Sequence, residues 1–475
     1  MRYLTLMALS LVLGGEALAD SPMRLCVRHS LATFVDVGYV GDDFLNDKAV
    51  PVPAYGVKAR VTLLGNTLFD DYVDEDTGCT PLLPVTRGAA HRVRLYGDAE
   101  VDGNRVKVWG ADVQAESWEL DDGDFDEPVY DQDYIWYPST LPLVSTGYLT
   151  TQGEPAWHIA AVVGHALRRD NGGITGQTFR LIYDDAENSS AHSERGRIRI
   201  GGEHSDKKTV IAHELGHALQ AFARGSTEAL DVESNHDYSL GLVNDACTSG
   251  MWADASGHRY NSREYQSAAV HEGFAHFYAA LAFNRDDEYN CSFKPYRDVD
   301  WNNDGYFTFN ADLCCDGKDD GNTCGTWSPT QTCYYPDMPE TSVDHTGPVS
   351  CETTPAYYGV TELQPPTHDH LTYCTDLSRS GLVRMWPDGT PYDWMRFFWD
   401  VHTNTGGISL EQILQVYGAA GANNWIATSP AWYQHSDDYP AARLLLAAED
   451  QGVGVIWEAQ GTWNGVHTDA YTGGY

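Results

Sequence analysis

The first part of the chain carries short apolar runs that alternate with polar positions. Residues 57–64 and 91–96 are the clearest of these runs, and Gly, Asp and Asn separate them from their neighbours. Short strands with turn residues at regular spacing are typical of an all-β sandwich. We therefore predict a small β-sandwich over residues 20–120. Its expected role is accessory, because no pattern in it indicates catalysis.

The pattern changes after an acidic, irregular stretch at residues 121–133. Like charges lie too close together there for a packed element, which predicts a linker over residues 121–140, with a calcium site at the junction as the alternative. Beyond it, residues 178–183 and 196–200 resemble strands. Helical spacing is found in residues 159–169, 207–222, 267–283, 393–402, 410–417 and 440–451. Residues 141–475 are thus expected to form an α+β domain.

The chain begins with an apolar run at residues 4–13, which is followed by Ala17-Leu18-Ala19. Small residues at this place are typical of a signal peptidase site. A membrane anchor is the alternative, but the run has about half of the roughly 20 residues that a spanning helix needs. We predict a cleaved export signal over residues 1–19, a secreted protein and no membrane insertion.

The formal net charge of the chain is −38. Such a balance argues against binding nucleic acid or anionic lipid, since both need basic faces. The carboxylates can instead hold calcium, or they can simply solvate an exported protein.

Ten cysteines in a chain with an export signal indicate disulfides rather than free thiols. Cys26 and Cys79 lie near the N-terminus, and we predict that they pair. Zinc-ribbon sites need two Cys-x-x-Cys pairs, and the sequence contains none. The remaining cysteines crowd one region and are Cys247, Cys291, Cys314, Cys315, Cys324, Cys333, Cys351 and Cys374.

The strongest local feature is the pentapeptide His-Glu-Leu-Gly-His at residues 213–217, inside an apolar helical run. His213 and His217 share one helical face, so both imidazoles can bind one zinc ion. Zinc lowers the pKa of a bound water towards about 7, and Glu214 can take the proton of that water. Chance occurrence is the alternative, although three polar residues in an apolar helix are costly to bury unless they are paired or coordinated.

A catalytic zinc site needs a third protein ligand from another segment. We choose Glu272, because residues 267–283 form a second apolar helical run that polar residues interrupt. Other acids between the two segments could replace it, namely Asp231, Glu233, Asp237 and Glu264.

The pentapeptide followed by Glu272-Gly-Phe-Ala resembles the zincin metallopeptidases, specifically the gluzincin branch, in which a glutamate on a later helix completes the site. The resemblance covers roughly residues 150–285. It implies a Zn²⁺ cofactor, a protein or peptide substrate, and an edge strand before the first zinc helix that binds extended substrate. Residues 196–200 are suitably placed for that strand. The metzincin branch is disfavoured, since it would place Gly and His where this chain has Gln220 and Ala223.

Two further histidines lie beside the expected third ligand. His276 follows Glu272 by one helical turn, and we predict that it supports a zinc ligand, with a merely structural core histidine as the alternative. His271 is interpreted as a core residue. The group that stabilises the oxyanion stays open among Tyr417, Tyr433, His402 and His435.

A second ion site is predicted in a cysteine-rich insert over residues 285–380. Asp300, Asn302 and Asp304 place oxygen ligands at alternate positions, and Gly305 follows them as in an EF-hand-like loop, which suits Ca²⁺. The usual glutamate near the end of such a loop is absent, because residue 311 is alanine. A solvated acidic turn is the alternative.

The sequence thus predicts a secreted zinc metalloendopeptidase, with a zincin-like α+β catalytic domain after a small β-sandwich. One alternative is a zincin-fold adhesion or binding protein with a structural metal. Another is a zinc hydrolase that acts on a non-peptide amide or a glycan-linked substrate. The intact Glu214 favours an enzyme, since a structural metal site has no use for that carboxylate.

Overall fold

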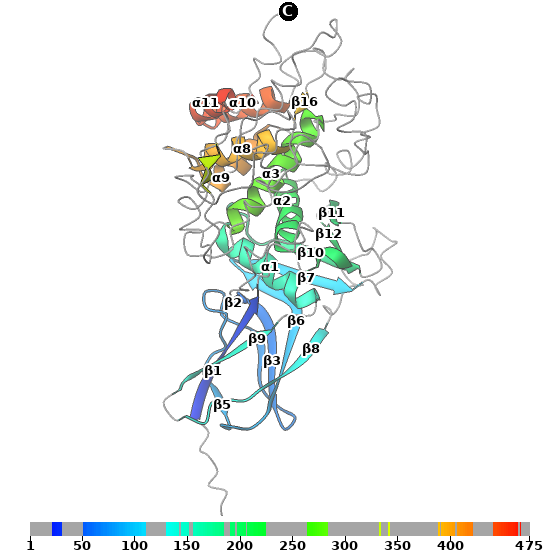
Figure 1. Cartoon of the computed structure of the whole chain (residues 1–475), viewed down its shortest axis with the longest axis vertical. Coiled ribbons are helices and arrows are strands. Elements are labelled where there is room, and N and C mark those ends of the chain that lie inside the picture. Colours follow the sequence, from blue (N-terminus) through cyan, green and yellow to red (C-terminus); the bar gives the residue numbers. More distant parts are fainter. Residues whose placement is uncertain are drawn as a thin grey trace, which may run out of the picture.

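A computed structural model of the chain places the strands towards one end of the molecule and most helices towards the other (Figure 1). The order of the elements, strands first and helices afterwards, agrees with the predicted α+β class. None of the described helices is long and apolar enough to cross a membrane. The structure describes residues 21–30, 51–110, 130–141, 144–151, 155–184, 191–194, 197–205, 207–224, 264–283, 332–333, 341–342, 388–389, 391–403, 406–420, 440–463 and 466.

Two sheets build the strand-rich end. In the smaller sheet, β1 pairs antiparallel with β2 and β5 and parallel with β9. The larger sheet runs in the order β11-β12-β10-β7-β6-β3-β4, and β8 also pairs with β6. The smaller sheet consists of β1 (Ser21–Ser30), β2 (Pro51–Pro53), β5 (Leu83–Val85) and β9 (Thr146–Thr151). The larger consists of β3 (Val57–Leu63), β4 (Asn66–Tyr72), β6 (His91–Val101), β7 (Asn104–Gly110), β8 (Tyr130–Trp136), β10 (Thr178–Asp184), β11 (Ala191–Glu194) and β12 (Arg197–Gly201).

The predicted disulfide between Cys26 and Cys79 is confirmed. The two residues face each other in an isolated antiparallel bridge, where Cys26 belongs to β1. Among the other cysteines, the structure describes only Cys333, in β14 (Thr332–Cys333), which pairs with β15 (Thr341–Ser342). The predicted export signal at residues 1–19 lies outside the described residues.

The linker predicted over residues 121–140 is wrong for the part that the structure describes. Residues 130–136 form β8, which pairs antiparallel with β6 from His91↔Trp136 to Tyr96↔Tyr130. Aromatic residues at alternate positions, Tyr130, Tyr134 and Trp136, favour a strand, but the acids between them hid this period. The sheet also continues past the predicted boundary at residue 141, since β7 pairs parallel with β10.

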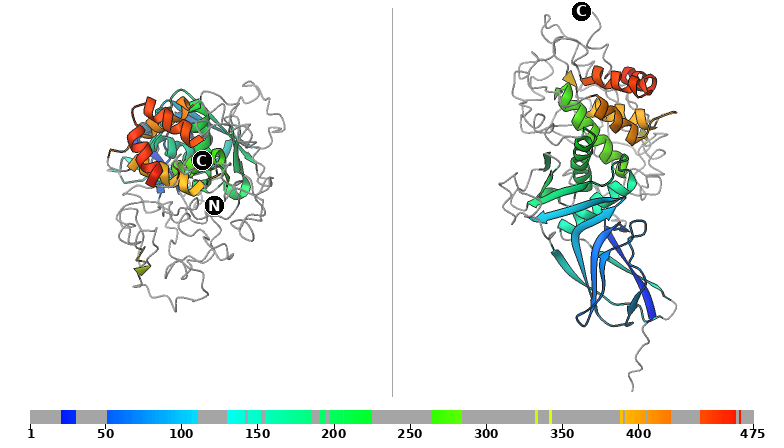
Figure 2. Two further views of the ribbon diagram at one scale, coloured as in Figure 1. Left: turned by 90° about the horizontal axis from the view of Figure 1, so that it is seen from above. Right: turned by 180° about the vertical axis from the view of Figure 1, so that it is seen from behind.

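Helices cover the continuation of the larger sheet. α1 packs on β6 and β7, α2 packs against α1 and α3, α8 lies along α3, and α9 contacts α2 (Figures 1 and 2). The helices are α1 (Pro155–Arg169), α2 (Lys208–Arg224), α3 (Gln266–Phe283), α8 (Pro391–Thr403), α9 (Leu410–Ala419), α10 (Pro440–Asp450) and α11 (Gly454–Trp463). A short pair, β13 (Glu264–Tyr265) and β16 (Asp388–Gly389), precedes α3 and α8.

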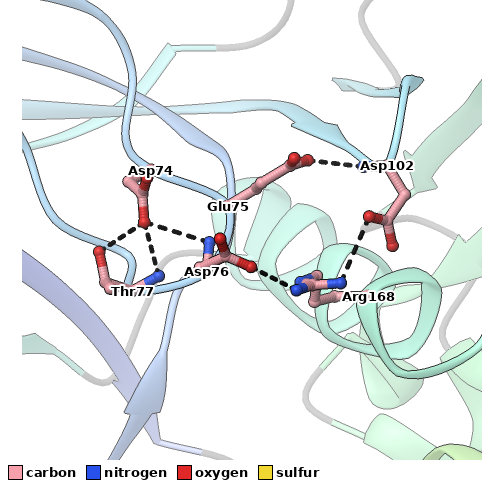
Figure 3. A network of polar contacts seen from close by, with 6 residues as sticks. All are labelled: Asp74, Glu75, Asp76, Thr77, Asp102 and Arg168. Carbon is pink, nitrogen blue, oxygen red and sulfur yellow. Dashed lines mark hydrogen bonds and ion pairs between the residues drawn. The ribbon is translucent and has the colours of Figure 1, made fainter.

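A polar network ties the end of α1 to two turns of the β region (Figure 3). The guanidinium of Arg168 pairs with Asp76 and, at 3.3 Å, with Oδ1 of Asp102. Oδ1 of Asp74 accepts hydrogen bonds from the backbone and hydroxyl of Thr77 at 2.9 and 2.7 Å, which closes the turn that carries Asp76. Because Arg168 is partly exposed, each ion pair contributes at most about 1 kcal/mol, and the network chiefly sets orientation.

Three buried histidines meet where β1 packs against α1. His29 on β1 is 0% exposed, and its ring centroid lies 5.9 Å from that of His158 and 6.5 Å from that of His165, both on α1. The indole of Trp157 also packs edge-on against His29. Burial, followed by the charges of the two neighbouring histidines, lowers the pKa of His29 well below its ordinary value. His29 is therefore neutral in the folded chain.

Acid should consequently destabilise the fold through His29. Because its pKa is lowered by folding, this contribution is fully present above the ordinary pKa of 6.5 and is lost as pH falls below it, when the unfolded chain takes up the proton. The slope is about 1.4 kcal/mol per pH unit for one histidine. Denaturant unfolding of wild-type and His29→Phe protein between about pH 8 and 5 should show a shallower slope in the variant. Identical slopes would contradict the prediction.

Candidate metal centre

Helix α2 brings the pentapeptide to the centre of the helical layer. Its apolar face is buried through Ile211, Ala212, Leu215, Ala218 and Leu219. The imidazoles of the two motif histidines, 13% and 12% exposed, lie on one side of the helix with ring centroids 4.8 Å apart. The glutamate between them is 5% exposed. The helical spacing that the sequence predicts is therefore present, and the motif faces a largely dry space.

Helices α2 and α3 approach each other closely at Gly216. A Cβ atom at this position would lie 2.8 Å from Cα of Ala275, a distance that real Cβ atoms essentially never show. Glycine is thus required for backbone contact between the two helices. This contact brings Glu272, one helical turn before residue 275, up to the motif histidines.

Three ligand atoms converge between the helices. Nε2 of His213 lies 3.0 Å from Oε2 of Glu272, and Nε2 of His217 lies 3.6 Å from the same oxygen. The two Nε2 atoms are 3.2 Å apart. Tetrahedral zinc with bonds of roughly 2.0 to 2.1 Å separates its ligand atoms by about 3.3 Å. The three atoms therefore have the spacing that a tetrahedral metal requires, with a fourth position left for water or substrate.

His276 contacts the other ring nitrogen of His213, Nδ1. The two Nδ1 atoms are 3.1 Å apart, and the ring centroids are 4.1 Å apart. His213, Glu272 and His276 also form a group that could hold a metal, with one ligand atom from each lying within 4.8 Å of the others. The set of His213, His217 and Glu272 is more compact, because Nε2 of His217 lies 3.2 Å from Nε2 of His213 and 3.6 Å from Oε2 of Glu272. His276 is better placed to hydrogen-bond His213 at Nδ1, as metal-bound histidines usually require.

A buried polar network that the sequence analysis missed holds the other ring nitrogen of His217. Its Nδ1 lies 3.3 Å from Oε1 of Gln220, which also lies 3.2 Å from Nδ1 of His271. The hydroxyl of Tyr417 is 3.1 Å from that same His271 nitrogen. The available signal was a polar Gln220 three residues after His217 in an otherwise apolar run.

Two of the remaining candidates for site residues have described side chains, and their printed contacts are with groups other than the three ligand atoms. Tyr417, one candidate for the oxyanion group, is 0% exposed and contacts His271, and His402 directs Nδ1 to the carbonyl of Ile408 at 2.9 Å. Glu264, an alternative third ligand, belongs to β13. Outside the described residues lie Tyr433, His435, Asp231, Glu233, Asp237 and the predicted calcium ligands Asp300, Asn302 and Asp304.

The strand at residues 196–200, predicted to be the edge of the sheet, is not the edge: β11 lies outside it. Residues 197–201 form β12, which pairs parallel with β10 and antiparallel with β11 and is therefore internal. β11 ends the sheet among the described residues, and it lies against α2. β11 is only four residues long, and apolar and polar residues do not alternate clearly in it. The sequence pattern therefore does not predict this strand.

The charges around His217 raise its pKa. Burial opposes the charged imidazolium and is the largest effect, but the carboxylate of Glu272, together with Glu214 and Gln220, outweighs it, so the pKa of His217 lies above 6.5 in the metal-free chain. Metal binding requires neutral imidazole, so a proton competes with the metal at this residue.

The affinity of this centre for a divalent metal, with Zn²⁺ as the probe, should therefore fall in mild acid. The loss begins as pH falls through the raised pKa of His217, above pH 6.5, and approaches tenfold per pH unit for one displaced proton. Competition against a chromophoric chelator, corrected for the protonation of the chelator, measures this dependence. A constant affinity from about pH 8 to 5.5 would contradict it.

Comparison with known proteins adds no family. No protein-family model matches the chain, and no curated protein matches it. What the centre can do therefore follows from its own chemistry. Two imidazoles and one carboxylate can hold a divalent metal and leave a coordination position open, and a buried carboxylate next to the first imidazole can accept a proton there.

Proposed function

We propose that the chain is a secreted zinc-dependent hydrolase that cleaves peptide bonds. The observation that carries the proposal is the convergence of His213, His217 and Glu272 at separations of 3.0, 3.2 and 3.6 Å, next to Glu214. Zinc, when bound, would polarise the carbonyl of the substrate and make a water acidic enough to lose its proton near neutral pH.

Glu214 is the residue that would move the proton. It directly follows His213 on α2, and the charge of its carboxylate is one of the causes that raise the pKa of His217. The side chain is 5% exposed, and a positioned carboxylate can act as the general base for a metal-bound water. Glu214 would take the proton of the attacking water and pass it to the leaving amine.

The edge of the larger sheet favours an extended peptide as the substrate. β11 pairs on one side with β12, antiparallel, and within the described sheet it has no strand on its other side. Extended peptides bind such edges by adding a strand through main-chain hydrogen bonds. Because β11 lies against α2, a peptide added there would lie on the side of the sheet next to the helix that carries His213 and His217.

Cleavage of a denatured-protein mixture by the purified chain tests this function. We expect cleavage that a chelator stops and that stoichiometric zinc restores. Cleavage that persists in the metal-free protein would refute the metal mechanism. Zinc bound at the centre with no cleavage of any peptide would instead favour a binding protein, or a hydrolase of another amide or of a glycan-linked substrate.

A further inference from the structure

The side chain of Gln220 contacts both helices of the metal centre, at His217 on α2 and at His271 on α3. It is 0% exposed, and its Oε1 lies 3.3 Å from Nδ1 of His217 and 3.2 Å from Nδ1 of His271. We propose that Gln220 is a positioning residue, which holds His217 in the tautomer that presents a bare Nε2 to the metal. The proposal rests on the metal centre described above, but it does not depend on which bond the chain hydrolyses.

The orientation of the amide follows from its contact with the α3 backbone. Nε2 of Gln220 donates to the carbonyl oxygen of His271 at 3.4 Å. The reverse orientation would place two acceptor oxygens against each other, which neither could satisfy. With the amide nitrogen held at the carbonyl, Oε1 is the atom that faces the two imidazoles.

This orientation decides where the hydrogens of both histidines lie. A carbonyl oxygen only accepts hydrogen bonds, so His217 and His271 must each donate from Nδ1. A neutral imidazole carries one hydrogen, and with that hydrogen on Nδ1 the Nε2 lone pair of His217 is available as a ligand. The Nε2 of His217 is the atom that lies 3.2 Å from Nε2 of His213 and 3.6 Å from Oε2 of Glu272.

Helix α9 contributes one further residue, Tyr417, to this network. The hydroxyl of Tyr417 lies 3.1 Å from Nδ1 of His271, and this tyrosine is 0% exposed while His271 is 3% exposed. The N–H of His271 is thereby directed at two acceptors, the hydroxyl oxygen and Oε1 of Gln220. Water has no access to compete for the amide, so each hydrogen bond keeps its partner.

The same amide also sets the place of the third ligand. His271 directly precedes Glu272, so the hydrogen bond from Gln220 to the His271 carbonyl fixes α3 against α2 at the residue before the carboxylate. One turn earlier on α2, Gly216 makes the backbone contact with Ala275. Loss of Gln220 should thus disturb the tautomer of His217 and the approach of Glu272 together.

Two substitutions separate the acceptor from the shape of the side chain. Gln220→Met keeps the length but loses the acceptor, and we expect zinc affinity of the purified chain at pH 8 to fall about 10- to 100-fold, the usual cost of removing a partner of a metal-bound histidine. Gln220→Glu keeps an acceptor for His217 but loses the donor to the His271 carbonyl, so its zinc affinity should lie between those of Gln220→Met and wild type. Tyr417→Phe leaves Oε1 in place and should lose less affinity than Gln220→Met.

A measurement on the wild-type chain makes the test independent of folding in the variants. In the zinc-free protein at alkaline pH, nitrogen NMR of labelled histidines should find the His217 hydrogen on Nδ1, with the signal assigned by its loss in His217→Ala. A hydrogen on Nε2, or equal zinc affinities for Gln220→Met and wild type, would overturn the proposal. Zinc binding by a wild-type chain that cleaves no peptide would refute the proposed function and leave this proposal intact.

Discussion

Glu214→Gln should slow peptide hydrolysis strongly while the protein keeps its zinc. The amide has the size of the carboxylate but cannot take a proton from water, and a positioned general base typically contributes about 10²- to 10⁴-fold to a rate. We therefore expect kcat/KM on a peptide substrate to fall by at least about 10²-fold. The measurement pairs peptide kinetics with metal analysis of the same preparation.

The control for this substitution is Glu449→Gln, which makes the same chemical change on the exposed face of α10. It should leave both the rate and the zinc content at wild-type values. Hydrolysis by Glu214→Gln at the wild-type rate would refute the role of this carboxylate. A parallel loss of zinc would show that Glu214 mainly holds the site together.

Glu272→Ala should remove most of the zinc affinity. Removing residues that only hydrogen-bond a ligand already costs about 10- to 100-fold, so removal of one of three protein ligands should cost more than about 100-fold. The carboxylate also lies close to both Nε2 atoms, at 3.0 and 3.6 Å. Chelator competition measures the affinity, and unchanged zinc content would mean that another acid completes the site.

Two histidine variants distinguish the possible ligand sets. If His217 is a ligand, His217→Ala should match Glu272→Ala, whereas His276→Ala should cost about 10- to 100-fold, as for a residue that orients His213. The opposite ranking would assign the metal to the group of His213, Glu272 and His276. The contrast is informative because His276 contacts Nδ1 of His213, whereas His217 contacts Nε2.

Local features of the candidate site were predictable from the sequence. The four-residue spacing of His213 and His217 places them on one helical face by geometry alone, and the apolar residues around them predict α2. The apolar run around Glu272 likewise predicts α3. In each case neighbouring residues carry the pattern, so no distant contact is needed to recognise it.

Strand pairing was predicted less well, since it depends on residues far away in the chain. β8 looked like a linker because its acids dominate the pattern, yet its backbone pairs antiparallel with β6. β12 looked like the edge of the sheet, and only the pairing with β11 shows that it is internal. The division between a β-sandwich and a separate α+β domain failed for the same reason, because β7 and β10 share one sheet.

The sequence by itself determined which groups the candidate site contains: two histidines one turn apart, a carboxylate between them and an acid on a later helix. Only the tertiary structure decided how these groups meet. Gly216 allows α2 and α3 to touch, and Gln220 finds His271 across that contact. A buried amide in an apolar run predicts a hydrogen bond, but its partner depends on which helix packs beside it.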